Sequence, residues 1–176
     1  MSAKFGPAGN CESFSKVHKS SLAAPRWIAD FGLDCYEYQC GKGVHVGKEI
    51  AVKIGENAQA AGISLSLHAP YFINLANPDQ DALQKTIGYI TAGCQAADWM
   101  GARRVVIHSG ALMKRERAQA LETAKKSLTK VISACDSQGF SHITLCPETM
   151  GKINQLGDLD EVLELCTLDG RLVPCI

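Results

Sequence analysis

Two histidines and one glutamate close three apolar segments of the sequence. His68 ends ISLSLH, His108 ends RRVVIH, and Glu148 ends ITLCPE. Each residue alone could be an ordinary polar side chain, but neutral imidazole nitrogen and carboxylate oxygen are the donors that zinc and similar divalent ions bind. A glutamate that bridges two ions could also support phosphate chemistry, because paired metals polarise a phosphoryl oxygen and activate water. Together, the three residues predict a metal site.

Short apolar strands alternate with amphipathic helices along the chain that carries these residues. We expect strands at residues 4–7, 35–40, 63–67, 103–108, 143–148 and 172–176. Helices are expected at residues 21–31, 47–61, 79–100, 114–138 and 159–166. About six strands and five helices in alternation predict an α/β fold with a parallel sheet and right-handed crossovers. Because parallel strands end at one edge, we expect the candidate ligands to meet there.

Both a doubly wound sheet and a (β/α) barrel fit this alternation. The sequence contains neither the G-x-G-x-x-G spacing of dinucleotide-binding folds nor a G-x-x-x-x-G-K-[ST] phosphate loop. Functional residues that end several different strands favour the (β/α)8 TIM-barrel type. Such barrels usually need roughly 200 residues or more, and this chain has 176. We therefore expect residues 1–176 to form a single, incomplete barrel domain that lacks strands seven and eight.

The composition of the chain excludes several classes of protein. The formal net charge is zero, so a surface that binds a polyanion must be local. The eight cysteines include no C-x-x-C pair, and the first residues do not resemble a signal sequence. This pattern favours reduced thiols in a cytoplasmic protein. No apolar run approaches the ~18 residues of a membrane span, so we expect no membrane partner.

The loops that follow the three candidate ligands contain aromatic and basic residues. Tyr71 and Phe72 lie in the first loop, MKRER at residues 113–117 in the second, and Lys152 in the third. Basic side chains beside phosphates, with an aromatic ring that stacks on or wedges between bases, would allow a neutral protein to bind DNA. The alternative is that MKRER is a solvated helix start.

Five segments carry a resemblance to a known family. In order, FGPAGNCESF, HAPYFINLANP, VVIHSG, PETMGKINQLG and LVPCI resemble consecutive barrel segments of the endonuclease IV family of apurinic/apyrimidinic endonucleases. The resemblance implies that His68 and His108 are ligands of one zinc ion. It also implies that Glu148 bridges two zinc ions and is the catalytic carboxylate. For DNA binding the resemblance implies Tyr71 and Asn74, and Lys152 is the basic loop residue that we expect to bind DNA with them.

The resemblance further implies an activity and a partner. Members of the family hold three zinc ions and hydrolyse the phosphodiester 5′ to abasic sites in double-stranded DNA. Their remaining ligands lie on later strands, and this sequence ends at Ile176. We therefore expect residues 1–176 alone to show no appreciable cleavage and to self-associate through open sheet edges.

Two other readings of the sequence remain open. One is a metal-dependent sugar isomerase or epimerase of the related xylose-isomerase-like barrels, for which Glu37 would be the additional site residue. The other is a non-catalytic fragment whose unpaired sheet edge binds a partner.

Overall fold

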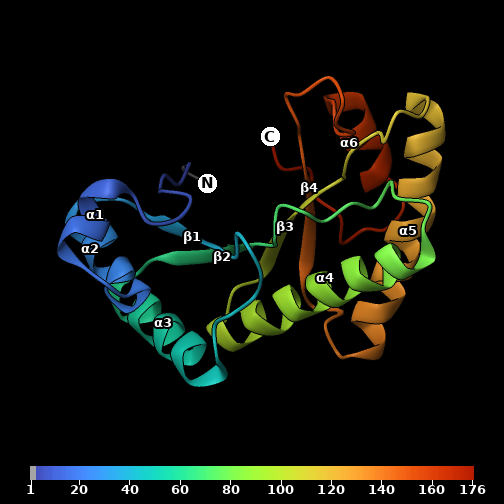
Figure 1. The fold of residues 1–176 in the computed structure, drawn as a ribbon. Helices are drawn as coiled ribbons and strands as arrows, with labels where there is room; N and C mark the ends of the chain where they lie inside the picture. Colours follow the sequence, from blue (N-terminus) through green and yellow to red (C-terminus); the bar gives the residue numbers. More distant parts are fainter. Residues whose placement is uncertain (1–2) are drawn as a thin grey trace.

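A parallel sheet of four strands runs through the middle of the molecule, and the helices follow its outer side (Figure 1). The computed structural model describes residues 3–176. The strands are β1 (Cys35–Gln39), β2 (Ser64–His68), β3 (Arg104–His108) and β4 (Thr144–Glu148), paired in chain order. Because each strand is joined to the next by a helical crossover, all four strands end at the same edge of the sheet.

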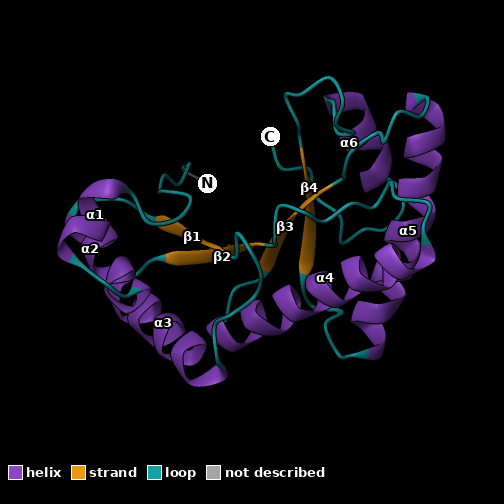
Figure 2. Cartoon of the chain, in the orientation of Figure 1, coloured by secondary structure: helices purple, strands orange, loops and turns teal. Residues whose placement is uncertain are grey.

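The helices supply these crossovers (Figure 2). Within residues 3–176 they are α1 (Glu12–Val17), the 3-10 turn η1 (Ser21–Ala23), α2 (Ala24–Asp30), α3 (Lys48–Ala61), α4 (Gln80–Met100), α5 (Arg117–Ser137) and α6 (Leu159–Cys166). Helix α4 is capped at its start by Asp79, whose side chain accepts a hydrogen bond from the Ala82 backbone at 2.7 Å. Its C-cap is Gly101, which has a φ of 71°. None of these helices is both long and apolar enough to cross a membrane.

The two faces of the sheet differ in chemistry because side chains alternate between them. Leu67, Val105 and Ile107 point toward the helices and are fully buried in the main hydrophobic core. The opposite face is concave and looks toward the open side of the arc (Figure 1). The residues on this concave face include Glu37, Ser66, His68, Val106, His108, Cys146 and Glu148.

The two outermost predicted strands are not continuous strands. The segments predicted at 4–7 and 172–176 lie in parallel beside β1 and β4, but the only pairing found there is by isolated bridges at Ala8, Leu172 and Cys175. Pro7 in the first segment, and Pro147 of β4 beside the second, have no backbone N–H to donate across these pairings, while Val173 and Cys175 donate to the carbonyls of Leu145 and Pro147. Residues 3–176 therefore contain four continuous strands and not the six predicted. Both outer segments nevertheless lie beside the strands where the first and sixth strands were expected.

Several helix ends also differ from those predicted. The helix expected from residue 114 begins at Arg117, because Met113 and Lys114 have φ angles of 54° and 60°, which a right-handed helix does not allow. Helix α1 was not predicted, since its 6 residues bury only Phe14 and show no helical periodicity. Residues 21–31 divide into η1 and α2, with Pro25 in the first turn of α2. The alternation of strands and helices is unchanged.

Close contact of α3 with the end of α4 gives a test of the packing. A Cβ atom at Gly55 would lie 2.4 Å from the Met100 carbonyl oxygen. We expect Gly55→Ala to lower the free energy of unfolding by about 1–3 kcal/mol, because the two helices must move apart. Urea unfolding followed by circular dichroism measures the change.

The matched control is Gly88→Ala, at an exposed position inside α4 where no heavy atom lies within 4 Å of the added Cβ. It should raise the free energy of unfolding by roughly 0.5–1 kcal/mol, since alanine is the better helix former. Equal effects of the two substitutions would contradict the packing described.

Candidate metal centre

Three side chains meet at the carboxyl edge of the sheet. Glu148 Oε2 lies 3.2 Å from His68 Nε2 and 3.1 Å from His108 Nε2. The three donor atoms all lie within 4.8 Å of one another. They meet because β4 places Glu148 directly beside His108 of β3, while β2 ends on the other side of β3. The structure thus brings together the residues that the sequence singled out.

Backbone carbonyls orient both imidazole rings. His68 Nδ1 donates a hydrogen bond to the Ala69 carbonyl at 2.7 Å, and His108 Nδ1 donates to the Tyr71 carbonyl at 3.0 Å. A carbonyl oxygen only accepts, so the proton of a neutral ring lies on Nδ1 and the lone pair on Nε2. Each ring therefore presents to Glu148 the nitrogen that a metal ion would bind.

Each imidazole donates to the Glu148 carboxylate from Nε2 only when its ring carries a second proton, and a metal ion would take the place of that proton. Hydrogen bonds from His108 and His68 lower the pKa of the Glu148 carboxyl to about 2. Burial by itself would lower the pKa of His68, but its hydrogen bonds with Glu148 and the Ala69 carbonyl outweigh burial and raise it. Glu148 is therefore a carboxylate at neutral pH, as a metal ligand must be.

The donor set fits a single divalent ion. Bonds of ~2.0–2.2 Å to nitrogen and oxygen put neighbouring ligands of a tetrahedral zinc ion ~3.3–3.6 Å apart. The separations of Glu148 Oε2 from the two imidazoles, 3.2 and 3.1 Å, are close to this range. Two imidazoles and one carboxylate also leave one of four positions for water or substrate, as in catalytic zinc sites.

Tyr71 and Asn74 lie in the loop after β2, beside the three donors. The Tyr71 ring is 52% exposed and stacks on His108, with ring centroids 6.2 Å apart and an angle of 24° between planes. Asn74 has a different environment, since its Oδ1 accepts from the backbone N–H groups of Ala76 at 3.0 Å and Ala111 at 3.2 Å. Tyr71 thus borders the site, whereas the Asn74 oxygen ties the β2 loop to the β3 loop.

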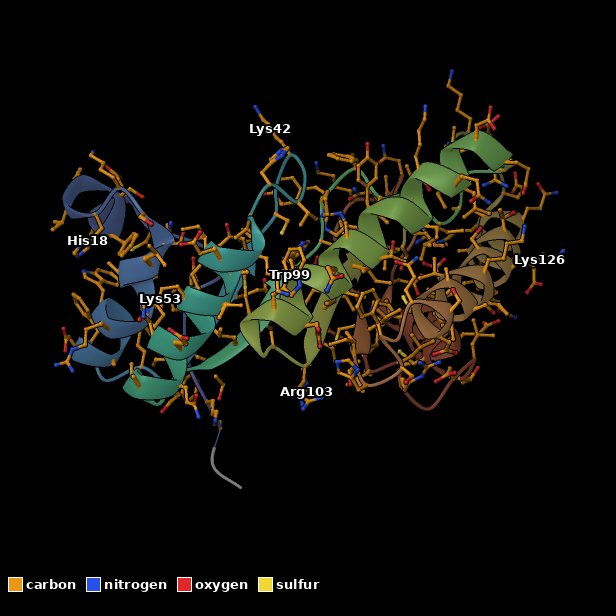
Figure 3. All side chains as sticks on the ribbon, turned by 90° about the horizontal axis from the view of Figure 1, so that it is seen from below. His18, Lys42, Lys53, Trp99, Arg103 and Lys126 are labelled. Atoms are coloured by element: carbon orange, nitrogen blue, oxygen red, sulfur yellow. The ribbon has the colours of Figure 1, made fainter. Side chains whose placement is uncertain are left out.

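The basic residues near the carboxyl edge of the sheet, in the loops that follow the strands and at the start of α5, fall into two groups. Lys152 is exposed in the loop after β4, and Lys114 is exposed in the loop after β3. Lys42 extends into solvent from the tip of the loop after β1 (Figure 3). Arg115, by contrast, donates to the Ala76 carbonyl and to Thr123 Oγ1, so it binds within the protein.

Arg117 also binds within the protein, to a glutamate that the sequence did not point out. Its Nε and Nη2 lie 2.6 and 2.8 Å from the two carboxylate oxygens of Glu161. Arg117 donates in addition to the carbonyls of Ile153 at 3.1 Å and Gln155 at 2.9 Å. This ion pair therefore holds the loop that carries Lys152. The spacing Asp158-x-x-Glu161, a capping box at the start of α6, was the available signal.

We expect Glu161→Gln to lower the free energy of unfolding by about 1–3 kcal/mol, because the Arg117 guanidinium loses its charged partner. Burial raises the pKa of the Glu161 carboxyl, but hydrogen bonds from Arg117 and from the Gly157 and Asp158 backbone outweigh burial and lower it. The stabilisation is then present above the ordinary carboxyl pKa and is lost as pH falls through the folded pKa. Urea unfolding of both proteins should show a difference that shrinks below about pH 4.

Glu164→Gln is the control, since Glu164 also lies in α6 but pairs with Lys125 at an exposed position. Exposed pairs contribute about 0–1 kcal/mol. If Glu164→Gln lowered the free energy of unfolding as much as Glu161→Gln, the Arg117–Glu161 pair would have no special role.

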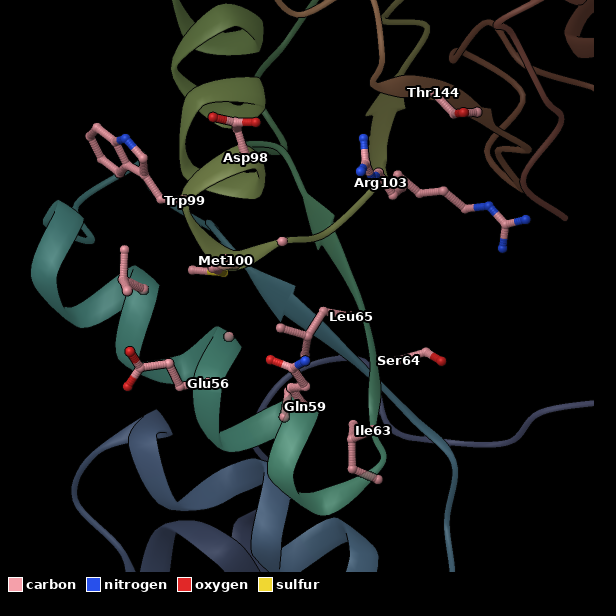
Figure 4. A pocket seen from close by; sticks show the side chains of 15 residues that line it. Glu56, Gln59, Ile63, Ser64, Leu65, Asp98, Trp99, Met100, Arg103 and Thr144 are labelled. Atoms are coloured by element: carbon pink, nitrogen blue, oxygen red, sulfur yellow. The ribbon is translucent and has the colours of Figure 1, made fainter.

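A cavity of about 760 Å³ lies at the opposite end of the sheet (Figure 4). Its lining includes Ser64, Arg104 and Thr144, the first residues of β2, β3 and β4. The three candidate ligands are the last residues of the same strands. In parallel (β/α) folds the chemistry takes place at the carboxyl ends, so this cavity is separate from the candidate metal centre.

Glu37, the residue that an isomerase would use, lies on the concave face below the candidate ligands. Its Oε1 accepts a hydrogen bond from Gln39 Nε2 at 2.7 Å, and its Oε2 lies 3.4 Å from Ser66 Oγ. It lines a cavity of about 860 Å³ on that face, together with Arg104 and Cys146. Glu37 is not part of the group of metal-ligating side chains found in residues 3–176.

Comparison with known proteins places most of the chain in one family. Residues 25–171 match the family model described as a xylose isomerase-like TIM barrel. An uncharacterized protein of Methanocaldococcus jannaschii is 29% identical over 149 residues, which are 85% of this chain and 53% of that protein. A probable endonuclease 4 of Acholeplasma laidlawii is 30% identical over 113 residues, which are 62% of this chain and 37% of that protein.

Solved structures show the same fold at lower identity. Endonuclease IV from Thermus thermophilus superposes with a TM-score of 0.70 at 19% identity, over 89% of this chain and 57% of that chain. D-psicose 3-epimerase from Clostridium cellulolyticum, in a complex with D-tagatose, gives a TM-score of 0.72 at 14% identity over the same shares. The chain therefore spans between about a third and a little over half of the length of these proteins.

Proposed function

This chain belongs to the xylose isomerase-like TIM barrel family, and we propose that it carries part of the metal centre of a zinc-dependent endonuclease acting at abasic sites in DNA. The observation that carries the proposal is the convergence of His68, His108 and Glu148 beneath a half-exposed tyrosine. The barrel class and the resemblance to endonuclease IV, both predicted from the sequence, are confirmed. Because the chain spans only part of its relatives, the activity is proposed for the whole protein.

The chain's own residues would bind and orient the reacting groups. A zinc ion held by His68, His108 and Glu148 would supply a Lewis acid and a water of lowered pKa. The two imidazoles are fixed by their carbonyl partners, so their Nε2 atoms stay directed at one point. The Glu148 carboxylate would offset part of the positive charge of a bound metal ion and supply the oxygen donor of the set. The reaction proposed is hydrolysis of the phosphodiester 5′ to the abasic site.

The rim of the site would bind the DNA. Tyr71 would offer its exposed ring face to a base or sugar, as aromatic residues do in DNA-binding loops. Lys152 would neutralise a backbone phosphate, with Lys42 and Lys114 as further exposed cations. Asn74 would act mainly by holding the Tyr71 loop, with its amide nitrogen as the group that could reach DNA.

We expect Glu148→Gln to weaken zinc binding at least tenfold and to abolish cleavage of an abasic duplex by the whole protein. The amide removes the negative charge shared by both imidazoles and binds metal far more weakly than a carboxylate. Competition with a chromophoric chelator measures the zinc affinity. Asp98→Asn, a carboxylate change at the amino-end cavity, is the control. Unchanged zinc affinity and cleavage in Glu148→Gln would show that the site is elsewhere.

Tyr71→Ala should weaken binding to an abasic duplex by about three- to tenfold or more, the range of one aromatic stacking contact. Its melting temperature should change little, because the ring is half exposed. Fluorescence anisotropy with a labelled duplex gives the affinity. Phe31→Ala removes an aromatic ring that is 65% exposed near the amino end of β1 and should leave DNA affinity unchanged. A large drop in melting temperature with unaltered DNA affinity would make Tyr71 a packing residue.

A sugar isomerase or epimerase is the second candidate function, because Glu37 lies on the same concave face as the three donors. Its carboxylate is held by Gln39 and Ser66 rather than directed at the imidazoles. Zinc affinity discriminates the two functions. If Glu37→Gln lowered the zinc affinity as much as Glu148→Gln, the result would favour the isomerase or epimerase. That residues 1–176 alone show no appreciable cleavage and self-associate stays a prediction.

A further inference from the structure

The loop after β1 touches the aromatic residue at the rim of the candidate metal centre. The backbone N–H of Tyr71 donates to the Gly41 carbonyl at 3.4 Å. A Cβ atom at Gly41 would lie 3.1 Å from the Tyr71 hydroxyl oxygen and 3.4 Å from its ring carbon Cζ. The Tyr71 side chain therefore packs directly against the backbone of Gly41, and a side chain at position 41 would contact it.

Backbone conformation does not explain why residue 41 is glycine. Gly43, in the same loop, has a φ of 142°, which favours glycine. Gly41 is not among the residues of the described chain that have a positive φ. Its backbone would accept a side chain, so contact with the Tyr71 ring is what distinguishes Gly41.

Tyr71 connects this contact to the metal centre through two different groups. Its carbonyl accepts the hydrogen bond from His108 Nδ1 at 3.0 Å. Its ring stacks on His108 and lies 5.9 Å from the His68 ring, centroid to centroid. A shift of Tyr71 would therefore move both the side chain at the rim and the acceptor that orients one imidazole.

We infer that Gly41 is a positioning residue, which by lacking a side chain allows the Tyr71 ring to lie close over the two imidazoles. A larger residue at position 41 displaces the ring outward and disturbs the carbonyl that orients His108. The consequences for zinc and DNA binding rest on the proposed function, whereas the contact between Gly41, Tyr71 and His108 concerns the chain alone.

The test is a double-mutant cycle of Gly41→Val and Tyr71→Ala. Three quantities are measured for each variant: the NMR resonance of His108 Nδ1–H in metal-free protein, the Kd for Zn²⁺, and the Kd for an abasic duplex. Gly41→Val should shift the resonance and weaken both affinities by about three- to tenfold, the range of one aromatic contact. In the Tyr71→Ala background the same substitution should change none of them, because the ring through which Gly41 acts is gone.

Gly47→Ala is the matched control, since a Cβ at this loop glycine meets no heavy atom within 4 Å. Effects of Gly41→Val that are equal with and without the Tyr71 ring would overturn the inference, because Gly41 would then act through the folding of its own loop. If the resonance shows the expected coupling but the unsubstituted protein binds neither zinc nor DNA, the positioning role stands and the proposed function fails.

Discussion

The register between β3 and β4 determines the candidate metal centre, because it places His108 directly opposite Glu148 where both strands end. Side chains alternate between the faces of a sheet, so a slip of one residue would turn Glu148 toward the helices and separate the donors. The buried side chains of Leu145 and Pro147, which alternate with Glu148 along β4, oppose such a slip, because it would expose them and bury charge. The same core that stabilises the sheet therefore assembles the site.

Polar side chains hold the loops at this edge of the sheet to one another. From the sequence alone, Asn74 and Arg117 would be expected to bind DNA instead. Asn74 ties the β2 loop to the β3 loop, and the Arg117–Glu161 pair holds the β4 loop. Arginine suits this role because its planar guanidinium donates to several acceptors at once. The exposed cations at this edge are lysines, whose mobile side chains suit contacts with phosphate. The basic residues that bind within the protein are thus arginines, and those of the proposed DNA-binding surface are lysines.

The sequence predicted which three donors lie together better than it predicted the contacts that hold the surrounding loops. His68, His108 and Glu148 could be recognised because ligand type and strand-end position are local properties, and parallel strands bring such ends together. The role of Glu161 could not be read in the same way, because Arg117 lies far from it along the chain and charge alone does not specify a partner. The outer strands were overpredicted, because Pro7 and Pro147 have no backbone N–H and so interrupt the pairing of the outer segments with β1 and β4. Helix α1 was missed because so short a helix carries almost no periodic signal.

X-ray absorption at the zinc edge, measured on the zinc-loaded protein, tests the central claim most directly. The chain has eight cysteines, which offer zinc a competing set of ligands. If the ion binds His68, His108 and Glu148, its ligands are nitrogen and oxygen at ~2.0–2.2 Å, with the outer-shell scattering of two imidazoles. A shell dominated by sulfur at ~2.3 Å would place the metal on cysteine thiolates and contradict the account.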